Sequence, residues 1–96
     1  MPSYLVETFL ARGCAGERTA RETRARSAAE ELTQAGTAVR FDGVIHVPED
    51  EICFFMFGAP SSREVALAAQ RAELDAFRVV EAVTSREEQA CSSESA

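Results

Sequence analysis

A chain of 96 residues, 46% of them apolar, is long enough to form one globular domain with a modest core. Its net charge of −6 at pH 7 argues against a nucleic-acid binder, which would need a basic surface, and against binding to anionic membranes. No apolar run approaches the roughly 20 residues that span a bilayer, and the first residues lack the basic segment of a signal peptide. We therefore expect a cytoplasmic protein.

The first half of the chain predicts a strand followed by a long helix. Aromatic and β-branched residues at 4–10 favour a strand in which Glu7 is the only charged residue. A glycine-containing loop leads to residues 17–35, where alanine and leucine recur at helical spacing until Gly36, which is typical of a helix end. The apolar stripe of this helix consists mainly of small side chains, so the helix can lie close to a sheet.

Residues 37–47 predict a second strand, which an acidic turn at 48–51 joins to the next strand as an antiparallel hairpin. Strict alternation along this segment divides its side chains between two faces. One face would carry Val39, Phe41, Gly43, Ile45 and Val47, and the other would carry Arg40, Asp42, Val44 and His46.

The next segment, Ile52–Phe57, is apolar at every position and is the strongest feature of the sequence. A strand with one face in water alternates between apolar and polar residues, so this run predicts a central strand that is buried on both faces. We expect one set of side chains to pack under the helices, namely Ile52, Phe54 and Met56. We expect the other set to face away from the helices, namely Cys53, Phe55 and Phe57.

The last third of the chain predicts a second helix, a fourth strand and a tail. Ser61 and Glu64 have the spacing of a capping box, which indicates that a helix begins here and continues to about residue 73. Residues 77–83 predict a strand that carries Glu81. The polar, small residues 85–96 are typical of a mobile tail, which leaves residues 1–84 as the domain.

The order of strand, helix, strand, strand, helix, strand predicts the α+β class and a ferredoxin-like fold. Right-handed crossovers would place both helices on one face of a four-stranded antiparallel sheet, with the first and third strands in the centre. No element is left to cover the other sheet face, and monomers rarely expose such an apolar surface. We therefore expect a homodimer that packs sheet against sheet as a dimeric α+β barrel.

Four segments resemble one known family, and together they span residues 2–83: 4–7, 47–51, 57–61 and 78–83. This small, mostly actinobacterial, ferredoxin-like family is often labelled nickel-binding protein and is otherwise a domain family of unknown function. The resemblance implies a dimer and, in metal-binding members, a His in the second strand and a Cys in the third. Those two positions fall on Val44 and Phe55 here, so we expect that this chain lacks the nickel site.

His46 and Cys53 lie two residues from those positions and are the remaining candidates for a metal site. His46 could also be a general base, or it could be a partly exposed histidine beside a turn. Cys53 could be a nucleophile or a ligand if a cation such as Arg40 were near, although a buried Cys is more often a small hydrophobic residue. Glu7 could be a base if it faces the barrel interior, or it could pair with Arg40 or Arg78.

The sequence supports three hypotheses about function. The first is a dimer that binds a small apolar ligand in the sheet cavity, with these lining residues: Glu7, Arg40, Asp42, His46, Cys53, Phe55 and Phe57. The second is a cofactor-independent cyclase, isomerase or monooxygenase of natural-product metabolism, by analogy with enzymes on dimeric α+β barrels. The third is an accessory protein that binds a partner and has no pocket. Nickel would enter only through the family resemblance, and no nucleic-acid or membrane partner is expected.

Overall fold

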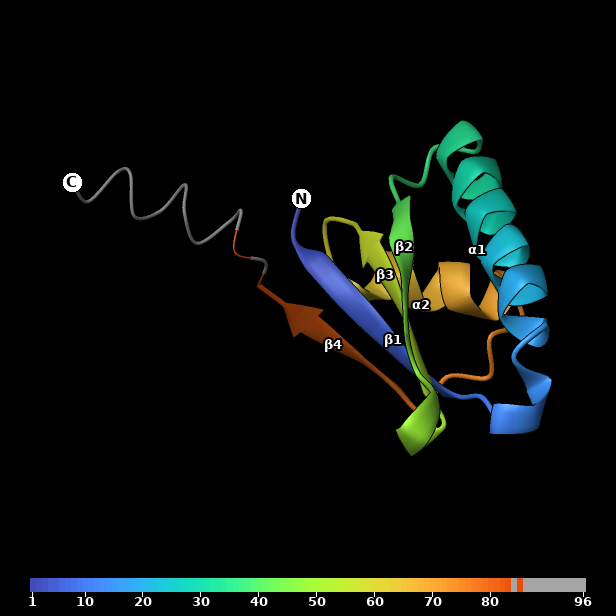
Figure 1. Ribbon diagram of the computed structural model, residues 1–96. Helices are drawn as coiled ribbons and strands as arrows, with labels where there is room; N and C mark the ends of the chain where they lie inside the picture. The colour runs from blue at the N-terminus through green and yellow to red at the C-terminus, as the bar shows by residue number, and fades with distance from the viewer. Residues whose placement is uncertain (84, 86–96) are drawn as a thin grey trace.

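The computed structural model describes residues 1–83 and 85, and it contains four strands, two α-helices and two short 3-10 helices. Figure 1 shows both α-helices on the same side of the sheet. In chain order the elements are β1 (Ser3–Phe9), η1 (Arg12–Cys14), α1 (Glu17–Gln34), β2 (Arg40–Val47), η2 (Pro48–Asp50), β3 (Ile52–Gly58), α2 (Ser62–Arg71) and β4 (Arg78–Ala82).

The four strands form one antiparallel sheet in the order β2-β3-β1-β4. β1 and β3 are therefore central, as the sequence predicts, and the fold is the ferredoxin-like arrangement of the α+β class. The predicted tail at 85–96 lies outside the described residues except for Ser85.

Both predicted helix signals are confirmed. The Ser61 amide donates to Glu64 Oε1 over 2.9 Å, and the Arg63 amide donates to Ser61 Oγ over 3.3 Å, so the capping box forms at the start of α2. Gly36 follows α1 with a φ of +101°, a left-handed conformation that favours glycine. Two arginines join the helices, because Arg24 donates to the Ala72 carbonyl and Arg71 pairs with Glu31.

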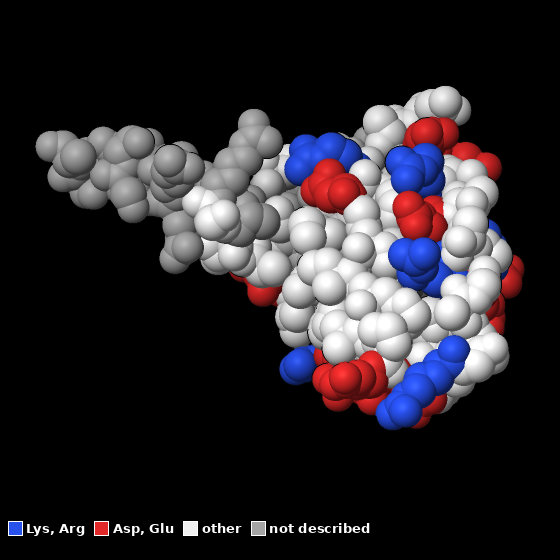
Figure 2. All heavy atoms as spheres, in the orientation of Figure 1, with Lys and Arg blue, Asp and Glu red and all other residues white. Residues whose placement is uncertain are grey.

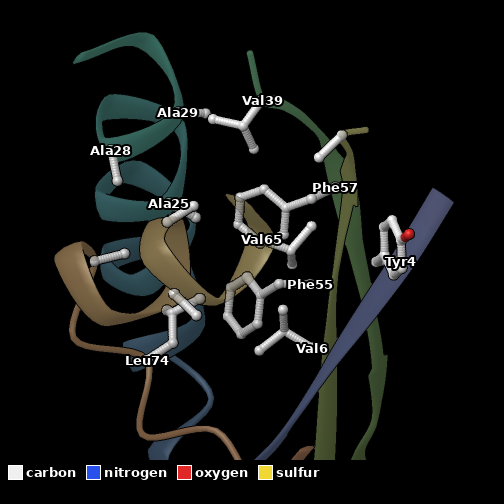
Figure 3. Packing of buried hydrophobic residues seen from close by; sticks show 14 of the residues in the cluster. Tyr4, Val6, Ala25, Ala28, Ala29, Val39, Phe55, Phe57, Val65 and Leu74 are labelled. Carbon is white, nitrogen blue, oxygen red and sulfur yellow. The ribbon is translucent and has the colours of Figure 1, made fainter. Parts of the chain in front are cut away.

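The expected orientation of β3 is wrong, because Cys53, Phe55 and Phe57 pack under the helices and are fully buried. In Figure 3 the rings of Phe55 and Phe57 extend from β3 toward α1 and α2. The helices offer small side chains to the core, so the sheet must supply the large ones that fill the space. The alanines of this interface are Ala25, Ala28, Ala29, Ala68 and Ala69.

The expected alternation along β2 is also wrong, because a β-bulge lies between Phe41 and Gly43. Phe41 pairs with Phe57 before the bulge, whereas Val44 pairs with Phe55 after it, so both face the helices. One additional residue reverses the face of every residue that follows. Ile45 therefore points away from the helices, and Gly43 adopts a φ of +142° that few other residues tolerate.

Candidate functional site

The sheet surface that faces away from the helices, called the open face here, is largely apolar and has no cover among the described residues. Cross-strand pairing places fifteen side chains or glycines of the four strands on it. Phe9 is 51% exposed and Ile45 is 46% exposed, although both are large apolar residues. The open face consists of Ser3, Leu5, Glu7 and Phe9 of β1, Arg40, Gly43, Ile45 and Val47 of β2, Ile52, Phe54, Met56 and Gly58 of β3, and Arg78, Val80 and Ala82 of β4.

Two ion pairs lie at diagonally opposite corners of the open face. Glu7 accepts a 2.7 Å hydrogen bond from Arg78 Nε, and its side chain is only 16% exposed. At the other corner, Arg40 donates to both carboxylate oxygens of Asp42, the bulge residue, over 2.5 and 3.1 Å. Of the two alternatives for Glu7, the structure shows the pairing with Arg78, and it also shows an ion pair between Arg40 and Asp42.

Gly58 provides the space that Arg40 occupies. A Cβ atom built on Gly58 would lie 2.5 Å from Arg40 Nη2, which is closer than side-chain contacts permit. The Arg40 guanidinium therefore lies across the end of β3 rather than near Cys53. The sequence hypothesis that Arg40 acts on the Cys53 thiol is wrong.

His46 and Cys53 are cross-strand partners, but they lie on the helix side of the sheet and not on the open face. Burial raises the pKa of the Cys53 thiol above its ordinary value of 9.0, and the charges of Arg21 and Arg18 only partly oppose this effect. Thr8 Oγ1 donates to the Cys53 carbonyl over 2.8 Å. A fully buried thiol of this kind is a poor nucleophile and packs as a small hydrophobic residue.

The Nε2 atom of His46 is buried and has no hydrogen-bond partner. With Cys53 it supplies two adjacent potential metal ligands, yet no group of three His, Cys, Asp or Glu side chains suited to a metal occurs among residues 1–83 and 85. Structural metal sites generally need four ligands, and catalytic zinc sites need three from the protein. The described part of one chain therefore does not fit a complete metal site.

The candidate residues consequently separate into two groups. Glu7, Arg40 and Asp42 belong to the open side of the sheet, whereas four others lie on the helix side: His46, Cys53, Phe55 and Phe57. The sequence contains a signal for this division, because Glu7 pairs with Phe54 and a charged residue on β1 marks the face away from the core. The sequence pattern does not identify Phe54, Met56 and Ile45 as lining residues, because β3 is apolar throughout and the bulge in β2 has no local signal in the sequence.

The surface also has two hollows that sequence reasoning did not anticipate. A groove of about 510 Å³ lies between the C-terminal half of α1 and the start of β2. A smaller hollow of about 350 Å³ lies between α2 and β4. Each forms at a sheet edge, between a helix and the strand that follows it in the chain.

The fold and the uncovered sheet define a ferredoxin-like α+β protein with one open face. This chain matches no protein family, no curated protein and no solved structure in the comparisons. Within the described residues, no helix is both long and apolar enough to cross a membrane.

Proposed function

We propose that two copies of this chain pack open face against open face and enclose a small apolar ligand between their sheets. The observation that carries the proposal is the apolar open face itself, with Phe54 and Met56 on the central strand β3 and Ile45 beside Phe54 on the edge strand β2. Figure 2 shows a broad uncharged surface beside α1, with charged side chains above and below it. Apolar surface of this extent favours association, because burial removes it from water.

Charge balance favours a second copy as the occupant of the open face. The chain has a net charge of −6, but the charged groups on this side of the sheet are two arginines and two carboxylates. A face with equal numbers of both signs can meet a copy of itself without net repulsion, as a two-fold interface requires.

The size of the sheet sets how much of it the interface must use. Four strands spaced about 4.8 Å apart, with five to eight residues at about 3.3 Å each, give a face of about 19 by 23 Å. A stable interface removes about 800 Å² of accessible surface from each partner. The dimer would therefore use the whole face and its rim, and the two corner ion pairs would lie at that rim.

The test is the oligomeric state of the Ile45→Asp variant, measured by analytical ultracentrifugation. We expect a dimer for the unmodified chain and a folded monomer for the variant, because an unpaired carboxylate is costly to bury in an apolar interface. Leu67→Asp is the matched control, since Leu67 is 42% exposed but lies on α2, away from the open face. A monomeric unmodified chain at high concentration, or an equal effect of Leu67→Asp, would refute the proposed interface.

The ligand is tested separately by native mass spectrometry of the purified dimer. We expect an additional small-molecule mass on the dimer that organic solvent extracts and that the Ile45→Asp monomer lacks. A dimer without any such mass, even after incubation with a cell extract, would refute the bound ligand but not the dimer interface.

One observation favours a catalytic role as a second candidate. Glu7 is a largely buried carboxylate on the open face, so it would border a ligand enclosed between the sheets. A cofactor-independent cyclase, isomerase or monooxygenase would use such a carboxylate as its base. If the extracted ligand is converted by the dimer, Glu7→Gln should abolish conversion while native mass spectrometry still detects binding; undiminished conversion would exclude Glu7.

We also propose that the chain is related to the nickel-binding family but has no nickel site. Val44 and Phe55, which stand at the family's ligand positions, are apolar cross-strand neighbours. Calorimetric titration with nickel, with Cys53→Ala as control, should give no binding at micromolar metal. Binding that the control variant loses would contradict this view and restore a His46–Cys53 metal site.

A further inference from the structure

We propose that the groove between α1 and β2 is a separate binding site for a monoanionic small molecule with a flat apolar body, such as an aromatic carboxylic acid. Its volume of about 510 Å³ lies within the range of about 300–1,000 Å³ that small-molecule sites occupy. It lies at the edge of the sheet within one protomer, so the proposal does not depend on the dimer.

The inner wall of the groove is apolar and rigid. Ala29 of α1 and Val39 are 3% and 5% exposed, and the half-buried Phe41 ring packs against Phe57 at a centroid distance of 5.3 Å. The Thr33 hydroxyl donates to the Val39 carbonyl over 2.7 Å and ties the last turn of α1 to the start of β2. This wall is fixed before any ligand arrives, which reduces the entropy cost of binding.

The charge at the mouth of the groove selects an anion. The Arg26 guanidinium lies over the Phe41 ring at 5.3 Å from its centroid, so a cation stands directly at the edge of the apolar wall. Arg26 contacts Glu22 over 3.4 Å, an exposed ion pair that contributes little and can exchange for a ligand carboxylate. Arginine binds carboxylates through two parallel hydrogen bonds, which would fix the orientation of the ligand.

The remaining charges set the number of acid groups on the ligand. Arg40 also lines the groove, but its guanidinium already pairs with Asp42. Glu30 lines the same groove and would repel a second carboxylate. Among the groove residues of α1 and β2, these charges favour a ligand with one acid group, held by Arg26, and an uncharged ring system that contacts Phe41.

The experiment uses 2-naphthoate as the probe and follows backbone amide shifts of the ¹⁵N-labelled chain by NMR. We expect saturable shifts concentrated at Ala29, Ala38 and Phe41, with a dissociation constant of about 1 mM or tighter. The neutral analogue 2-naphthamide should bind at least about tenfold more weakly, because it cannot form the charge-assisted hydrogen bonds. Absence of saturable shifts in the groove would overturn the proposal.

Three variants complete the design. Arg26→Gln should weaken 2-naphthoate about tenfold or more without affecting 2-naphthamide, whereas Arg63→Gln, an exposed arginine on α2, should change neither. Ala38→Trp should block both probes, since Ala38 is an exposed residue that lines the groove. Ile45→Asp should retain binding, which separates this site from the proposed dimer cavity. Equal affinity of the two probes, or an Arg26→Gln variant that binds normally, would refute the selection of an anion.

Discussion

Replacement of Phe55 by alanine tests which face of β3 the helices cover. Phe55 is fully buried and lies among Val6, Val65 and Leu74 in the core shown in Figure 3. Removal of a buried phenylalanine ring costs about 3–5 kcal/mol, because the surroundings do not fully fill the cavity. That is a large part of the roughly 5–15 kcal/mol by which small domains are stable. The same change at Phe54, on the open face, should cost a separate protomer much less.

Urea unfolding monitored by circular dichroism measures the difference. With a slope of about 2 kcal/mol per M, a loss of 4 kcal/mol lowers the unfolding midpoint by about 2 M. The effect of Phe55→Ala should not depend on protein concentration. The effect of Phe54→Ala should grow with concentration, because the ring contributes to the proposed dimer and not to the core. If Phe55→Ala does not fold, Phe55→Leu gives the same comparison at a cost of about 1–2 kcal/mol.

The outcome that would refute this assignment is also clear. If Phe54→Ala lowers the midpoint as much as Phe55→Ala in dilute solution, where a dimer dissociates, the helices do not distinguish the two faces of β3. A greater loss for Phe54→Ala under those conditions would mean that the strand has the opposite orientation.

Three further predictions follow from local features. Ser61→Ala should destabilise the fold by about 1 kcal/mol in urea unfolding. The Ser61 hydrogen bond lowers the pKa of the Glu64 carboxyl below its ordinary value of 4.5. The contribution of this cap to the free energy of unfolding is therefore fully present above pH 4.5 and should disappear as the pH falls through the lowered pKa. Urea unfolding at a series of pH values measures this loss. Iodoacetamide at pH 8 should label the exposed Cys14 but label Cys53 only after unfolding, because Cys53 is buried and its pKa is raised; peptide mass mapping distinguishes the two. Gly43→Ala should cost about 1–3 kcal/mol in the same urea assay, since its φ of +142° strains a residue with a Cβ atom.

The controls for these predictions come from the same chain. Ser62→Ala changes the neighbouring hydroxyl without removing the cap, so a loss equal to that of Ser61→Ala would contradict the role of the capping box. Gly13→Ala places a methyl group in open space at a glycine without a left-handed φ and should cost less than Gly43→Ala. Labelling of native Cys53 as fast as Cys14 would show that the core opens readily. A cap contribution that persists below the lowered Glu64 pKa would contradict the charged form of the cap.

The sequence by itself determined the order of the elements and their approximate ends. The capping box at Ser61 and the glycine after α1 are signals carried by residues close together in the chain, so both were predicted from local physical chemistry. The hairpin at 48–51 was predicted for the same reason, because its proline and acidic residues favour a turn. The ferredoxin-like topology then followed from this order and from the handedness of crossovers.

The tertiary structure alone decided which side chains from different strands share a face. β3 is apolar at every position from Ile52 to Phe57, so its own pattern does not specify which face meets the helices. The small residues of α1 and α2 resolve this ambiguity, since Phe55 and Phe57 fill the space that alanines leave. The bulge before Gly43 changes the alternation of β2 through its pairing with β3. The groove beside Arg26 and Phe41 forms only when α1 packs against the start of β2.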